Sequence, residues 1–148
     1  MKQSPMQLAL EQARLAARQG EVPVGAVLLD AAGELAASAH NRTEADSDPT
    51  AHAEILALRA ACVRAGSPRL PDHDLYVTLE PCAMCAAAIA AARIRRVYFA
   101  AYDPKGGGVE HGPRIFTQTT TNHRPEVYGG IDEADAAKLL QDFFKEKR

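Results

Sequence analysis

The chain has 148 residues, of which 47% are hydrophobic and 24% are charged. This length and balance predict one folded globular domain over residues 1–148 that needs no disulfides, and they exclude a disordered tail. The formal net charge of −2 excludes a strong overall attraction to polyanions, so any nucleic-acid partner must be met by a local basic patch.

The first part of the chain predicts a helix followed by a β-hairpin. Ser4 is a typical N-cap, and the apolar positions after it recur at helical spacing over residues 5–19. Residues 22–29 form a nearly continuous apolar run, and residues 34–39 supply a partner strand beyond a short turn. A polar stretch, residues 41–49, is then predicted to be a loop.

Helices and strands alternate along the rest of the chain. The predicted helices cover residues 50–65, 81–93 and 134–144, and the predicted strands cover residues 75–79 and 96–101. Residues 106–133 are weakly patterned, and no element is predicted there. This order of elements favours an α/β fold with three layers, α/β/α, around a mostly buried sheet.

The cysteine content and the N-terminal segment predict a cytoplasmic protein. Residues 1–18 mix Glu11, Arg14 and Arg18 with apolar positions, so they lack the uninterrupted apolar stretch of a signal peptide. No other segment is long and apolar enough for us to expect a membrane span. Without an export signal, cysteines point to metal binding or catalysis more readily than to disulfides.

Two pairs of reactive residues stand at predicted helix starts. His52 and Glu54 are two positions apart, and Cys82 and Cys85 are three apart, directly after Pro81. Residues three apart on a helix share a face, whereas residues two apart diverge, so Glu54 can reach past a metal that His52 binds. The partial positive charge of a helix N-terminus favours the thiolate, which is the form that zinc requires.

The combination of these side chains predicts a catalytic zinc site. Two sulfurs and one imidazole make three protein ligands, so tetrahedral zinc keeps its fourth position for water. A Cys-x-x-Cys pair alone is also typical of redox sites and of structural zinc sites. A redox pair does not explain His52 and Glu54, however, and a closed structural site needs a fourth ligand that no cysteine supplies. Cys62 lies on the apolar stripe of its predicted helix, where a core thiol is expected.

The remaining histidines and the basic clusters have ordinary interpretations beside functional ones. The other four histidines fall in loops or at element ends without a partner at ligand spacing, so a solvent-facing or locally bonded role is expected: His40, His73, His111 and His123. Two clusters are candidate phosphate-binding patches or simply solvated surface: Arg93, Arg95 and Arg96, and Lys145, Lys147 and Arg148.

The reactive residues also carry a family resemblance. His52-Ala53-Glu54, followed by Pro81-Cys82-Ala83-Met84-Cys85, resembles the signature of the cytidine deaminase superfamily. Longer stretches look like bacterial tRNA-specific adenosine deaminases, and they cover residues 22–27, 41–42, 48–54 and 75–82. The resemblance spans nearly the whole chain. It implies a cytidine-deaminase-like α/β/α fold with a central five-stranded mixed sheet.

The resemblance further implies a homodimer that binds one zinc ion per chain and converts the wobble adenosine of a tRNA anticodon to inosine. His52, Cys82 and Cys85 would hold the zinc, and Glu54 would move protons between the activated water and the base. Five residues would contact the substrate: Asn41, Asp103, Lys105, Phe144 and Arg148. The glycine-rich segment 106–116 departs from the Gly-Ala-x-Gly-Ser pattern of many members.

Three of the five implied substrate contacts also have a structural interpretation. Asn41 and Asp103 are typical turn residues, and the helical spacing of Phe144 with Leu140 also fits a core position. Motifs at the metal do not separate tRNA from a free base or nucleoside, such as guanine or cytosine, as the substrate. A zinc-stabilised RNA-binding module without catalysis is a further alternative, against which the retention of Glu54 argues.

Overall fold

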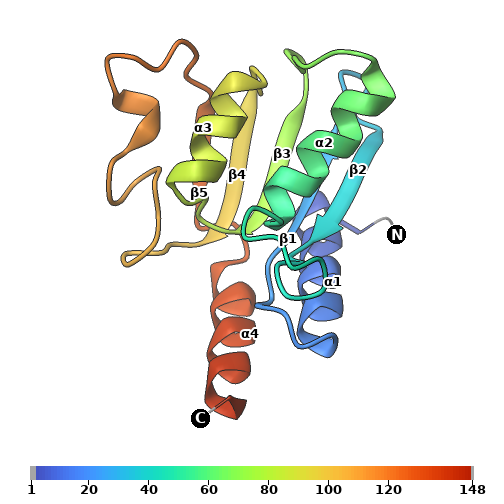
Figure 1. The fold of residues 1–148 in the computed structure, drawn as a ribbon, viewed down its shortest axis with the longest axis vertical. Helices are drawn as coiled ribbons and strands as arrows, with labels where there is room; N and C mark the ends of the chain where they lie inside the picture. The colour runs from blue at the N-terminus through green and yellow to red at the C-terminus, as the bar shows by residue number, and fades with distance from the viewer. Residues whose placement is uncertain (1–2, 148) are drawn as a thin grey trace.

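The computed structural model describes residues 3–147, in which a single five-stranded sheet lies between two layers of helices (Figure 1). The helices are α1 (Pro5–Arg18), α2 (Ala53–Ala65), α3 (Ala83–Ala91) and α4 (Glu133–Glu146), with a short 3-10 helix η1 (Ile115–Thr117). The strands are β1 (Gly25–Leu29), β2 (Leu35–His40), β3 (Asp74–Leu79), β4 (Arg96–Ala101) and β5 (Glu126–Gly129).

The sheet is mixed, and its strand order is β2-β1-β3-β4-β5. Strand β1 runs antiparallel to both of its neighbours, while β3, β4 and β5 run parallel to one another. The carboxyl ends of the three parallel strands therefore meet at one edge of the sheet. The expected α/β fold with a five-stranded mixed sheet is confirmed.

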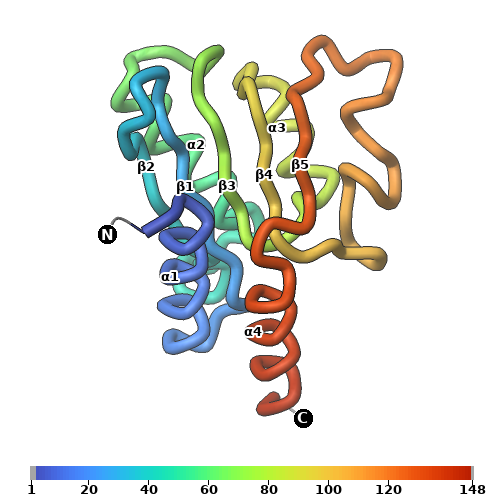
Figure 2. The backbone as a smooth tube through the Cα atoms, turned by 180° about the vertical axis from the view of Figure 1, so that it is seen from behind, coloured from blue at the N-terminus to red at the C-terminus, as the bar shows by residue number. Residues whose placement is uncertain are grey.

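Helices cover both faces of the sheet. On one face, α2 and α3 pack on a core that includes Val77, Ile89 and Phe99, all fully buried. On the other face, α1 and α4 pack on a smaller cluster that includes Met6 and Ala136. Seen from behind, α4 extends beyond the sheet, past the edge where the parallel strands end (Figure 2). Helices α2 and α3 begin at this same edge (Figure 1).

Local signals in the sequence explain where most of these elements begin and end. Helix α1 starts with a capping box in which Ser4 and Gln7 exchange side-chain to backbone hydrogen bonds. Helix α2 ends at Gly66, whose φ of 67° suits a residue without a side chain. Among the helices of residues 3–147, none has the length and apolar character required to cross a membrane.

Two features differ from the sequence-based prediction. Helices α2 and α3 each begin later than predicted, so His52 and Cys82 are extended N-cap residues and do not belong to a first turn. Strand β5 was not predicted at all. It has only four residues, lies at the sheet edge and is exposed at alternate positions, so it lacks the apolar run that marks a buried strand.

Candidate active site

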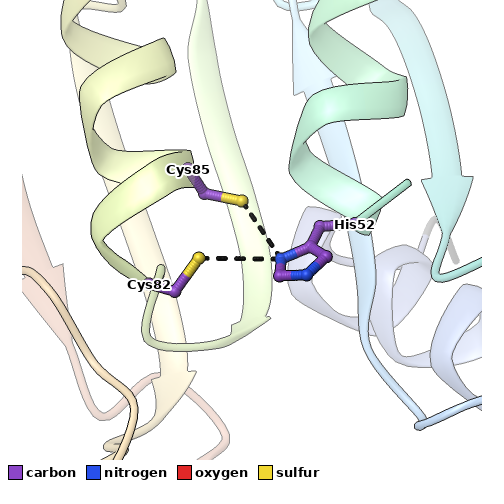
Figure 3. Close-up of side chains that lie close together, drawn as sticks. All are labelled: His52, Cys82 and Cys85. Carbon is purple, nitrogen blue, oxygen red and sulfur yellow. Dashed lines mark hydrogen bonds between the residues drawn. The ribbon is translucent and has the colours of Figure 1, made fainter. Parts of the chain in front are cut away.

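The three predicted metal ligands meet where α2 and α3 begin side by side. The Nδ1 atom of His52 lies 3.6 Å from the Cys82 sulfur and 3.5 Å from the Cys85 sulfur (Figure 3). All three ligand atoms fall within 4.8 Å of one another, which is a spacing that one metal ion can bridge. The adjacent N-termini of the two helices thus bring His52 close to cysteines that are 30 and 33 positions away in the chain.

The chemistry of these donors fits zinc, which binds thiolates and imidazole in tetrahedral sites. A hydrogen bond from the Cys85 thiol, with a further contribution from His52, lowers the pKa of Cys82 to about 4. The same hydrogen bond, together with burial, raises the pKa of Cys85. These contacts favour the thiolate form of Cys82, and both sulfurs would bind zinc as thiolates.

Glu54 lies in the first turn of α2, two residues after the histidine ligand. It is 4% exposed and lines a cavity of about 310 Å³ that also contains His52 and Cys82. Burial raises the pKa of its carboxyl to about 7. The Glu54 carboxyl group therefore faces the cavity, and it is not one of the three candidate metal ligands.

The cavity has the size of a small-molecule site and a mixed lining. Apolar side chains and polar groups share its wall: Val22, Val24, Leu79, Asn41, Thr43 and Asp103. The apolar part suits the faces of a heterocyclic base, and the polar groups provide a small number of directional contacts. This arrangement can hold a flat polar molecule against the metal ligands and Glu54.

Asn41 is placed in this wall and is 9% exposed. Its Oδ1 atom accepts a hydrogen bond of 2.9 Å from the backbone N–H of Ala53, the first residue of α2. That bond orients the amide group. Among the described residues Nδ2 has no hydrogen-bond partner, so its two N–H groups are left to donate to a ligand in the cavity.

The other predicted substrate residues are more dispersed. Asp103 lies in the cavity wall, where its Oδ1 accepts from the backbone of Gly106, and Lys105 is exposed on the same loop. Phe144 is 49% exposed on α4 and does not line the cavity, so the alternative of a core position is wrong. Arg148 lies outside the described residues.

Glu80, a buried residue in the cavity wall, was not predicted from the sequence. Burial alone would raise its pKa, but hydrogen bonds from the Asp103 backbone, from His111 and from neighbouring amides outweigh that effect and lower it. His111, for which a solvent-facing or locally bonded role was expected, donates from Nδ1 to Glu80 at 2.8 Å. The one feature of the sequence that could have pointed to Glu80 is its charge, because it stands between an apolar strand and Pro81.

The arginine cluster near residue 95 is not a phosphate patch beside this site. Arg95 makes two hydrogen bonds to Asp74, and Arg96 approaches both Asp74 and Glu126. These residues lie at the beginnings of β3, β4 and β5, which is the end of the sheet opposite the cavity. Cys62 is half-buried, packs against the core and is not part of the metal-binding group.

Comparisons with known proteins agree with this geometry. The model of the cytidine and deoxycytidylate deaminase zinc-binding region matches residues 1–101. The tRNA-specific adenosine deaminase of Agrobacterium fabrum is 57% identical over 144 residues, which are 97% of this chain and 93% of that protein.

Two solved structures place the likeness in three dimensions. One structure comes from a study of A-to-I editing by tRNA:A34 deaminases and is 55% identical to this chain, with a TM-score of 0.90. The match covers 92% of this chain and 98% of that structure's chain. The guanine deaminase of Nitrosomonas europaea is 25% identical with a TM-score of 0.76, covering 94% and 82%. The chain therefore belongs to the zinc-binding cytidine and deoxycytidylate deaminase family, and within it to the tRNA-specific adenosine deaminases.

Proposed function

We propose that this chain converts the wobble adenosine of a tRNA anticodon to inosine by hydrolytic deamination. The observation that carries the proposal is the 57% identity to a tRNA-specific adenosine deaminase along 97% of the chain. The site supports it, because three metal ligands and a buried carboxyl surround one base-sized cavity. Overall, water replaces the exocyclic amine on C6 of adenine, and ammonia leaves.

His52, Cys82 and Cys85 would hold the zinc, which lowers the pKa of a water molecule and so supplies a nucleophile at neutral pH. Glu54 would accept one proton from the water and deliver it to N1 of the purine ring, next to the carbon under attack. It would then take the remaining proton of that water, now on the oxygen bound to C6, and pass it to the leaving amine, so that inosine and ammonia form. The free N–H groups of Asn41 donate to the bound nucleoside and fix its orientation in the cavity.

We also assign RNA contacts to Asp103 in the cavity wall, to Lys105 on the same loop after β4, and to Phe144 and Arg148 at the C-terminal end. The loop borders the cavity. Helix α4 extends past the sheet edge at which α2 and α3 begin, so its exposed end lies on the side from which an RNA would approach (Figure 1).

A free base such as guanine is the second candidate substrate, and the fold of the Nitrosomonas europaea guanine deaminase is its support. That likeness holds at 25% identity, against 57% for the tRNA-specific relative. Motifs at the metal are shared by both classes. We therefore favour tRNA on the whole-chain identity.

Direct assay separates the candidates. The purified protein is incubated with an anticodon stem-loop carrying a wobble adenosine, and separately with free adenosine, cytidine and guanine, and the products are identified by mass. We expect inosine in the stem-loop only, lost after removal of metal with a chelator and restored by zinc. Efficient turnover of a free base without turnover of RNA would favour the second candidate. Binding of RNA without turnover of any substrate would favour the non-catalytic module.

We further propose that the chain forms a homodimer. A shallow apolar groove of about 400 Å³ runs along α2 and α3, and the side chains of Ile55, Cys62 and Pro68 contribute to it. Val63 beside it is 83% exposed. Substituting the exposed Ala91 in this groove, Ala91→Arg, should shift the molar mass measured by light scattering from dimer to monomer. A dimeric wild-type protein that stays dimeric in this variant would place the interface elsewhere.

Two remaining expectations stay proposals. We infer that residues 1–148 act as one domain, since the strands from both halves of the chain belong to one sheet. We also place the protein in the cytoplasm, where tRNA is processed. Limited proteolysis and cell fractionation test these two points.

A further inference from the structure

Glu80 directly follows β3, and its side chain is fully buried. Its Oε1 atom accepts hydrogen bonds from the backbone N–H of Asp103 at 3.0 Å and from Nδ1 of His111 at 2.8 Å. Its Oε2 atom accepts from the consecutive backbone N–H groups of Val109, Glu110 and His111, at 3.2, 2.9 and 3.1 Å. One carboxylate thus holds both ends of the segment from residue 103 to residue 111.

The glycines of this segment allow the close approach. A β-carbon on Gly107 would collide with Oε2 of Glu80. The backbone N–H of Gly108 donates to Pro81 at 2.8 Å, and a β-carbon there would lie only 2.5 Å from the backbone nitrogen of Ala83. The segment is therefore packed against the turn that leads into α3.

The same segment forms part of the cavity wall through Asp103 and Gly106, and it carries the exposed Lys105. We propose that Glu80 is a positioning residue: its buried carboxylate fixes the segment 103–111 as the wall that meets the RNA, and so sets substrate affinity. This inference rests on the proposed function. It assigns a role to part of the glycine-rich segment 106–116, in which the sequence departs from the pattern of many family members.

Glu80 acts on binding and not on proton transfer. Both of its oxygens are occupied by five donors, and the side chain has no exposed surface, so it has no free site for a substrate proton. The metal ligands and Glu54 are held by α2 and α3, not by the segment that Glu80 binds. Loosening the segment should therefore weaken substrate binding much more than it slows the chemical step.

The test compares Glu80→Gln with Glu34→Gln, the same change at an exposed position in the turn between β1 and β2, at the end of the sheet opposite the cavity. The amide of Gln keeps the size of the side chain but turns an N–H₂ group toward backbone N–H donors. Because a buried, charge-assisted set of bonds is disrupted, we expect KM for the anticodon stem-loop to rise by about tenfold or more. The kcat should change by less than about threefold, and metal analysis should still find one zinc per chain. Glu34→Gln should match the wild-type protein.

His111→Phe is the milder variant, and it tests the same anchor if Glu80→Gln does not fold. It keeps a ring beside Tyr102, whose own ring centroid lies 6.2 Å away, but removes the Nδ1 donor. Its KM should rise by a smaller factor, and the effects of His111→Phe and Glu80→Gln should be less than additive in the double variant. A fall in kcat at unchanged KM, or additive effects, would overturn the proposal.

Hydrogen exchange without RNA separates this inference from the proposed function. The backbone amides of residues 109–111 should exchange at least about tenfold faster in Glu80→Gln than in the wild-type protein, because their common acceptor is lost. Unchanged exchange would overturn the anchoring role whatever the substrate is. Accelerated exchange in a protein whose wild-type form leaves RNA unmodified would keep the anchor and reject the proposed substrate.

Discussion

Asn41 offers a sharp test of the site, because the structure gives the two ends of its amide different tasks. Oδ1 caps α2 by accepting from Ala53, and Nδ2 is left to donate into the cavity. Asn41→Ala removes both functions. Asn41→Asp keeps an acceptor for the Ala53 amide, with a negative charge that the helix N-terminus favours, but removes the donor.

The expected magnitudes separate the two variants. In Asn41→Ala the buried Ala53 N–H loses its acceptor, so the free energy of unfolding should fall by about 1–2 kcal/mol. For a chain of this size that corresponds to a fall of about 2–8 °C in Tm. Asn41→Asp should stay within about 1 kcal/mol of the wild-type stability. Both variants should lose about tenfold to a hundredfold in kcat/KM, because a polar atom of the bound base is left without its donor.

The assay combines thermal unfolding with deamination of the anticodon stem-loop, and zinc content is checked in each variant. Loss of activity in both variants with loss of stability in Asn41→Ala alone is the expected pattern. An Asn41→Asp protein as active as the wild type would show that the amide donor is not used on the substrate. An Asn41→Asp protein as unstable as Asn41→Ala would refute the capping role.

Three further predictions address the metal, the proton and the RNA. Cys82→Ser and Cys85→Ser should each lose most of the bound zinc in elemental analysis, since each removes one of three ligands, and full retention in both would contradict the assignment. Glu54→Ala should lower turnover by about 10²–10⁴-fold with zinc and fold intact, and a parallel loss of zinc would make Glu54 a ligand. Replacing Lys145 and Lys147 by neutral residues should weaken RNA binding. The plot of log binding constant against log salt concentration should become shallower by about 0.7–0.9 for each phosphate contact that is lost. An unchanged slope would show that α4 is not part of the RNA interface.

The metal centre could be predicted from the sequence because its chemistry is local. Cys82 and Cys85 are three residues apart at one helix start, and His52 and Glu54 are two apart at another, so the spacing places each pair at one helix N-terminus. It does not show that His52 and Cys82 precede the first turn as extended N-cap residues. The spacing does not predict that the N-termini of α2 and α3 lie side by side. That arrangement depends on the parallel pairing of β3 with β4 and on α3, which connects them.

The wall of the cavity was harder to predict, because it is held by contacts between distant residues. Glu80 binds amides 23 to 31 positions away, and nothing in the local pattern around residues 103–111 identifies their common partner. Strand β5 was missed for a related reason. Its four residues pair with β4 at the sheet edge, and this pairing, rather than any apolar run of its own, makes them a strand.

Charge explains why the RNA-facing surface cannot be inferred from composition. Two arginines of the most basic internal cluster are consumed by ion pairs with Asp74 and Glu126 at the far end of the sheet. The positive charge available to a polyanion then includes Lys105, on the loop that borders the cavity, and the lysines at the exposed end of α4. A few cations of this kind position a backbone but provide little selectivity. We therefore expect selection of the target nucleoside to come mainly from the shape of the cavity and from its polar wall, which includes Asn41 and part of the segment that Glu80 binds.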